Sequence, residues 1–100
     1  MTEWTFLTNH GLVLSYVAQH PRITARELGD AIGITERATR KIIADLSQAG
    51  YIIKKREGRR NRYRVNADIP LRHSTQQEAA IGDLLQGLGW RRRGRRRKDS

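Results

Sequence analysis

The 100-residue sequence predicts a mainly α fold with one small β-hairpin, an α+β arrangement. Three observations support this fold class. Residues 24–50 contain two amphipathic segments that each follow a threonine and are separated by Gly33. After Gly50 the spacing of apolar residues changes from the helical period to strict alternation, which is typical of strands. A second stripe of apolar residues at helical spacing lies near the C-terminus.

The first helix is expected over residues 9–19, with Thr8 or Asn9 as its cap. Its buried face consists of apolar residues at helical spacing, namely Leu12, Val13, Tyr16 and Val17. His20 should end this helix because a residue that precedes proline avoids the helical region. Arg22 and Ile23 then form a predicted strand of two residues.

The second helix should begin after Thr24. Glu27 stands at the third helical position, so the two residues can form a capping box. Leu28, Ala31 and Ile32 mark its expected buried stripe. Gly33 is suited to the left-handed position that follows a helix, and it therefore ends this one.

The third helix is expected over residues 35–49, with Thr35 as its cap. At 100° per residue one face is apolar, and the opposite face carries Arg37, Arg40, Lys41, Ala44 and Gln48. Long side chains that donate hydrogen bonds, placed around a small alanine, suit close contact with base edges and phosphates of a nucleic acid. The alternative is a solvated charged face on an ordinary helix.

Two strands are expected over residues 51–56 and 61–66, joined by a loop in which Gly58 can take a positive φ. Residues 54–64 contain seven cations and one anion, a net charge of +6. A solvated surface hairpin could carry such a charge. Phosphate contact, with an arginine in the minor groove, explains it better beside the helical pair.

The composition narrows the function classes. Twenty Lys and Arg against ten Asp and Glu give a formal charge of +10, which favours a polyanionic partner. The absence of cysteine excludes disulfides and thiolate metal sites. His10, His20 and His73 are scattered, and no nucleophile arrangement stands out, so we expect neither an enzyme nor a metal or other cofactor. No apolar run is long enough to span a membrane, and a cytoplasmic location is expected.

Residues 8–66 resemble the winged helix-turn-helix transcription regulators of the MarR and ArsR type in the order of their elements. One helix comes first, a pair of helices joined by a turn follows, and a basic hairpin comes last. The resemblance is carried by Gly33-Ile34-Thr35, by Ala38, Thr39, Ile42 and Leu46, by Ala49-Gly50-Tyr51-Ile52 and by Gly58-Arg59-Arg60-Asn61-Arg62-Tyr63. It implies that the helix of residues 35–49 lies in the DNA major groove and that residues 54–64 form the wing. The implied DNA contacts are Thr35, Arg37, Arg40, Lys41, Arg56, Arg59, Arg60 and Arg62. The chain lacks the cysteines of metal-sensing ArsR proteins and is shorter than a typical MarR protein, so a small-molecule effector is left open.

The C-terminal third begins with an extended connector around Pro70. Ser74 with Gln77, or Thr75 with Glu78, could form a capping box for a helix that runs to about Leu88. Its apolar stripe could fold back on the same domain or pair with a second copy of the chain. Pairing fits two-fold symmetric operators, and it makes the predicted dimer interface Ile81, Leu84, Leu85 and Leu88.

The sequence thus predicts three parts: a DNA-binding domain over residues 1–66, a connector and dimerisation helix over 67–90, and a disordered basic tail over 91–100. The expected function is that of a homodimeric regulator that binds double-stranded DNA sequence-specifically. The alternative is a winged-helix adaptor that binds protein or RNA.

Overall fold

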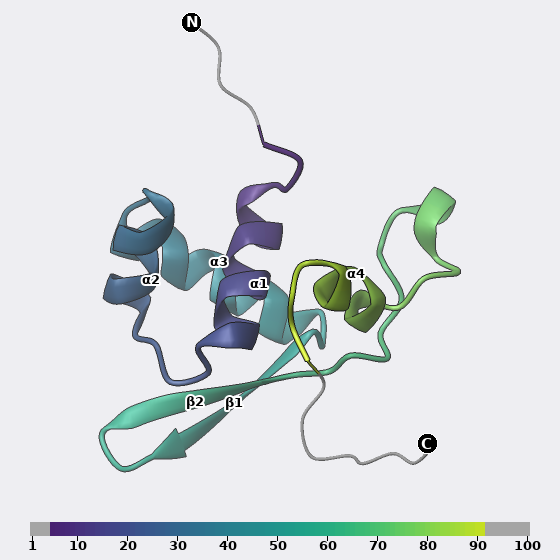
Figure 1. Ribbon diagram of the computed structural model, residues 1–100. Coiled ribbons are helices and arrows are strands. Elements are labelled where there is room, and N and C mark those ends of the chain that lie inside the picture. The colour runs from purple at the N-terminus through teal and green to yellow at the C-terminus, as the bar shows by residue number, and fades with distance from the viewer. Residues whose placement is uncertain (1–4, 92–100) are drawn as a thin grey trace, which may run out of the picture.

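The computed structural model describes residues 5–91. Its elements are α1 (Asn9–Gln19), α2 (Ala25–Ile32), α3 (Glu36–Gln48), β1 (Ile52–Glu57), β2 (Arg60–Val65), a 3₁₀ turn η1 (Ser74–Gln76) and α4 (Ile81–Gly87). Helices α1, α2 and α3 pack together, and the antiparallel hairpin of β1 and β2 projects beyond them to one side (Figure 1). Helix α4 lies near the base of the hairpin (Figure 1). The predicted α+β fold is confirmed.

The first two helices begin where the sequence predicts. The Thr8 hydroxyl caps α1 by accepting a hydrogen bond from the Gly11 amide at 3.3 Å. The capping box of α2 is complete, because the Glu27 amide donates to the Thr24 hydroxyl at 3.1 Å and the Thr24 amide donates to the Glu27 carboxylate at 3.0 Å. Gly33 ends α2 with a φ of 85°, as expected for a left-handed position.

The turn between α2 and α3 depends on a close contact at Gly29. A Cβ atom at this position would lie 2.7 Å from the Ile34 carbonyl oxygen and 2.9 Å from the Thr39 hydroxyl oxygen. Gly29 is buried, whereas Ala31 is exposed, so the prediction that Ala31 belongs to the buried stripe is wrong. The absence of a side chain at Gly29 lets the backbone of α2 touch the start of α3.

The hairpin differs from the prediction by one residue at each strand. The register pairs Glu57 with Arg60, so the turn consists of only Gly58 and Arg59. Gly58 has the expected positive φ, at 61°. The strand predicted at Arg22 and Ile23 does not form, because the Ile23 amide donates to the His20 carbonyl within a turn. One backbone hydrogen bond still joins this loop to β2, from the Tyr63 amide to the Pro21 carbonyl at 2.8 Å.

The predicted C-terminal helix begins later than its capping signals indicate. Residues 74–76 form only the turn η1, and α4 starts at Ile81 with the Ala80 amide donating to the Asp83 carboxylate. Backbone pairing explains the difference: the Leu71 amide donates to the Ala79 carbonyl at 3.0 Å, and the Ile81 amide to the Ile69 carbonyl at 2.7 Å. These bonds hold Ala80 extended beside the connector, which is incompatible with a helix that runs through this residue.

Helix α4 completes the core of its own chain. Ile81 and Leu85 are buried in one cluster with residues of α1, α2, α3 and the hairpin. The prediction that these two residues face a second copy is therefore wrong, and the alternative of folding back holds for them. Of the four predicted interface residues, Leu84, which is half-buried, and Leu88, which is 43% exposed, are the two that could contact a partner. The core thus extends beyond residue 66, the predicted end of the DNA-binding domain.

Candidate nucleic-acid interface

Helix α3 separates its faces as predicted. Thr39, Ile42, Ile43 and Leu46 are buried, while the opposite face exposes Arg37, Arg40, Lys41, Ala44 and Gln48. The Thr35 hydroxyl accepts the Ala38 amide at 3.0 Å, so the predicted cap is present. The Thr35 side chain is therefore already engaged in capping, although the residue is exposed beside the cationic face.

The three cations of α3 differ in their neighbours. Arg40 is paired with Glu36 at 2.7 Å, and Lys41 lies 3.8 Å from Asp45. Arg37 has no ion pair with another residue in the described part of the chain. Exposed ion pairs of this kind contribute roughly 0–1 kcal/mol, so a phosphate can replace either carboxylate. A ligand that binds Arg37 displaces no carboxylate of the described residues.

Asp45 links the cationic face of α3 to α1. Its carboxylate lies 2.8 Å from the His10 imidazole and near the Lys41 amine. The hydrogen bond with His10, more than the charge of Lys41, holds the pKa of Asp45 below its ordinary value. This carboxylate therefore stays ionised at neutral pH, and it places one negative charge beside the cations of α3.

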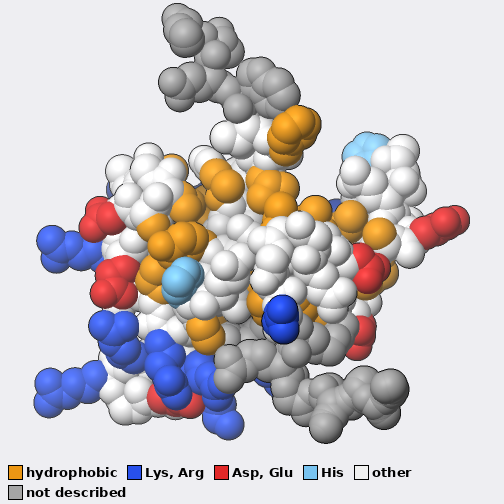
Figure 2. All heavy atoms as spheres, viewed as in Figure 1, with side chains coloured by type: hydrophobic (Ala, Val, Ile, Leu, Met, Phe, Trp, Pro, Cys, Tyr) orange, Lys and Arg blue, Asp and Glu red, His pale blue; other side chains and the backbone are white. Residues whose placement is uncertain are grey.

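The two faces of the hairpin carry different side chains. Residues opposite each other across the two strands have their side chains on the same face of the hairpin. The inner face therefore carries the buried Tyr63 with its partner Lys54, and also the pair of Arg56 and Asn61. Lys55 and its partner Arg62 therefore lie on the outer face. Lys and Arg side chains gather over the hairpin, at the lower left of Figure 2.

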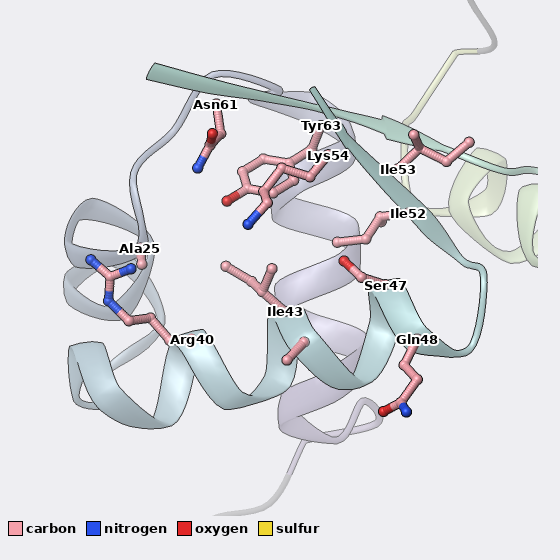
Figure 3. Close-up of a pocket in the computed structure, with 11 residues that line it drawn as sticks. Ala25, Arg40, Ile43, Ser47, Gln48, Ile52, Ile53, Lys54, Asn61 and Tyr63 are labelled. Atoms are coloured by element: carbon pink, nitrogen blue, oxygen red, sulfur yellow. The ribbon is translucent and has the colours of Figure 1, made fainter. Parts of the chain in front are cut away.

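A groove of about 710 Å³ separates α3 from the hairpin. Its apolar lining comes from Ile43, Ile52 and Tyr63, and Arg40 and Lys54 supply cations at its sides. Figure 3 shows Lys54, Asn61 and Tyr63 pointing from the strands into the space in front of α3. Sequence reasoning did not assign Lys54 or Asn61. The alternation around Tyr63 could have indicated Asn61, because every second residue of a strand shares its face, whereas Lys54 lies on the other strand and its place depends on the register.

The four arginines predicted as wing contacts have different surroundings. The Arg56 guanidinium donates to the Gly58 carbonyl at 2.9 Å, which places it across the turn. Arg59 is exposed and makes no ion pair with a described residue. Arg60 reaches the loop before α2, and Arg62 lies 3.7 Å from Glu57. Of the four, Arg59 is thus the one without an internal partner among these contacts.

Two negative findings concern only residues 5–91. No group of three or more His, Asp or Glu side chains is placed to hold a metal ion there. Within the same residues, no helix has the length and apolar character needed to cross a bilayer. The predicted basic tail lies, from residue 92 onward, outside the described residues.

Comparisons with known proteins agree with this geometry. Residues 7–53 match the profile of a family described as "Winged helix-turn-helix DNA-binding". No curated protein matches the sequence. Among solved structures, the fold is similar to that of MepR, a transcription regulator of the Staphylococcus aureus multidrug efflux pump MepA, at 15% identity and a TM-score of 0.55. The similarity covers 83% of this chain and 58% of the MepR chain. The chain therefore has a winged helix-turn-helix fold, and the predicted resemblance to winged-helix regulators is confirmed.

Proposed function

We propose that the protein is a transcription regulator that binds double-stranded DNA sequence-specifically, with α3 in the major groove and the hairpin as the wing on the minor groove and phosphates. One observation carries the proposal: Arg40, from the exposed cationic face of α3, and Lys54, the inward-facing cation of β1, lie on two sides of one groove. An α-helix fits the major groove, and a neighbouring basic hairpin can then follow the phosphate backbone. MepR, whose fold is similar, is itself a transcription regulator.

Within this interface Arg37 is proposed as the principal base-reading residue. It is exposed on α3 and has no described carboxylate partner. An arginine that donates two hydrogen bonds to guanine discriminates against other bases by about 1–3 kcal/mol. Arg40, Lys41 and the wing residues Arg56, Arg59 and Arg62 would contribute mainly phosphate contacts, whose strength falls as salt rises.

The test is selection of bound duplexes from a random pool, followed by titration of the selected duplex and a scrambled one. Arg37→Ala should weaken binding to the selected duplex by about 1–3 kcal/mol and relax preference at one position. The matched control is Arg72→Ala, which removes an exposed cation from the segment beyond the wing. Equal affinity of the wild type for both duplexes would contradict the proposal and favour an adaptor that binds protein or RNA.

We also propose that the protein acts as a homodimer, which would match a two-fold symmetric site. Of the predicted interface residues, those that remain available for pairing are Leu84 of α4, which is half-buried, and Leu88 directly after it, which is 43% exposed. Sedimentation of the wild type should show a dimer, and Leu88→Glu should shift it towards monomer without unfolding it. Gln86→Glu, at an exposed position of the same helix, is the control for the added charge. A wild-type monomer at every concentration would contradict this part of the proposal.

A further inference from the structure

The turn end of the wing, where Glu57 and Arg60 flank the turn, is joined to the loop before α2 and to α2 by a cluster of charged residues, which we call the wing latch: Arg22, Glu27, Glu57 and Arg60. The Arg60 guanidinium donates to the Arg22 carbonyl oxygen at 2.8 Å and lies 3.6 Å from the Glu27 carboxylate. The Arg22 side chain in turn donates to the Glu57 carboxylate at 3.0 Å. Two residues of the hairpin, Glu57 and Arg60, therefore contact one residue of the α1–α2 loop and one residue of α2.

The wing latch lies beside a backbone contact. The Tyr63 amide donates to the Pro21 carbonyl at 2.8 Å, and this bond joins β2 to the same loop. Glu27 belongs also to the capping box of α2, where its carboxylate accepts the Thr24 amide at 3.0 Å. The hydrogen bonds with Thr24, and after them the charge of Arg60, keep the pKa of Glu27 below its ordinary value. Glu27 is therefore ionised and fixed in position at neutral pH.

These contacts have a geometric consequence for the groove. Helix α2 is fixed to α3 at Gly29, where the backbones are too close for a side chain. A hairpin of two strands is only marginally stable by itself, so its angle depends on the contacts that hold it to the rest of the domain. Because the wing latch fastens β2 to the start of α2, it fixes the wing relative to α3 through α2.

We propose that Arg60 and Glu57 are positioning residues, which set the distance between wing and recognition helix, while Arg59 at the turn contacts DNA. This inference rests on the proposed function and corrects the role predicted for Arg60. The two arginines are adjacent and both exposed, yet only Arg60 has partners in the α1–α2 loop and α2. Glu57 is an anion within the basic wing, where its charge opposes phosphate binding. Its contact with Arg22 gives it a structural role that offsets this disadvantage.

The Glu57→Gln substitution tests the proposal through the direction in which the affinity for DNA changes. If Glu57 acts only through its charge, its neutralisation strengthens binding to every duplex. If it positions the wing, binding to the selected duplex weakens relative to the scrambled one, by about two- to fivefold for the loss of an exposed ion pair. Asp30→Asn is the control, since it removes an exposed negative charge from α2 without touching the wing latch.

A second comparison needs no DNA. Arg59→Gln and Arg60→Gln each remove one cation from the wing, so they alter its net charge equally. Arg60→Gln should speed hydrogen exchange of the Tyr63 amide, which is bonded to Pro21, whereas Arg59→Gln should leave it unchanged. Equal exchange rates in both variants, or tighter binding of both duplexes by Glu57→Gln, would overturn the inference. The preference of the wild type for its selected duplex is measured first, so failure of the proposed function is seen separately.

Discussion

Replacing Leu85 with alanine tests whether α4 belongs to the core of the winged-helix domain. Leu85 is 1% exposed and lies in the central cluster. Its truncation removes three buried carbon groups, each worth about 0.8 kcal/mol of transfer free energy. The cavity left behind adds to this loss, and buried leucines in other proteins lose about 2–5 kcal/mol on truncation. We therefore expect the free energy of unfolding to fall by about 3 kcal/mol, a large share of the total for a domain of this size.

The assay is urea denaturation followed by far-ultraviolet circular dichroism. Leu88→Ala, at the residue that directly follows α4, is the matched control, because Leu88 is 43% exposed and its truncation should cost less than about 1 kcal/mol. Both variants are measured at two protein concentrations, since the stability of an obligate dimer rises with concentration. If the two substitutions lower stability equally, the apolar stripe of α4 serves association and the assignment of Leu85 to the core is refuted.

Three further outcomes are expected. Gly29→Ala should destabilise the fold by about 1–2 kcal/mol, because crowding against a backbone oxygen 2.7 Å away outweighs the gain in helix propensity, whereas Gly87→Ala, with open space around it, should not; urea denaturation compares the two. Asp45→Asn should strengthen binding to selected and scrambled duplexes alike in fluorescence anisotropy, because it removes an anion and releases Lys41; weaker binding would mean that the carboxylate is needed to orient α3. Deleting residues 91–100, which include seven cations, should weaken binding to the selected and the scrambled duplex equally and make the dependence of log K on log salt shallower. A changed ratio between the two affinities would contradict a non-specific role of this segment.

The parts of the fold that follow from the sequence are those set by neighbouring residues. Thr24 and Thr35 each meet the amide that they cap three residues away, so the starts of α2 and α3 are visible in the sequence. The buried and exposed faces of α3 follow from the helical period alone. The start of α4 does not, because the local capping signals at Ser74 and Thr75 are overridden by backbone pairing between the connector and residues 79–81.

The candidate interface shows the same division. The period of α3 predicts that Arg37 and Arg40 point outward, and the structure agrees. It cannot predict that Arg60 turns back to Arg22, because the two residues are 38 positions apart and meet only after the chain has folded. The groove position of Lys54 depends on the hairpin register, which places it opposite Tyr63 of the other strand.

The connector also creates a closed loop at the side of the molecule. The bond between the Leu71 amide and the Ala79 carbonyl joins its two ends, and residues 72–78 between them are all exposed. Because the ends are held by backbone atoms, the loop can lengthen without altering either the connector or α4. A tag or fluorescent reporter inserted between Gln76 and Gln77 would therefore be carried on a surface separate from α3 and the wing, which makes this loop a practical attachment point for studying the protein on its DNA.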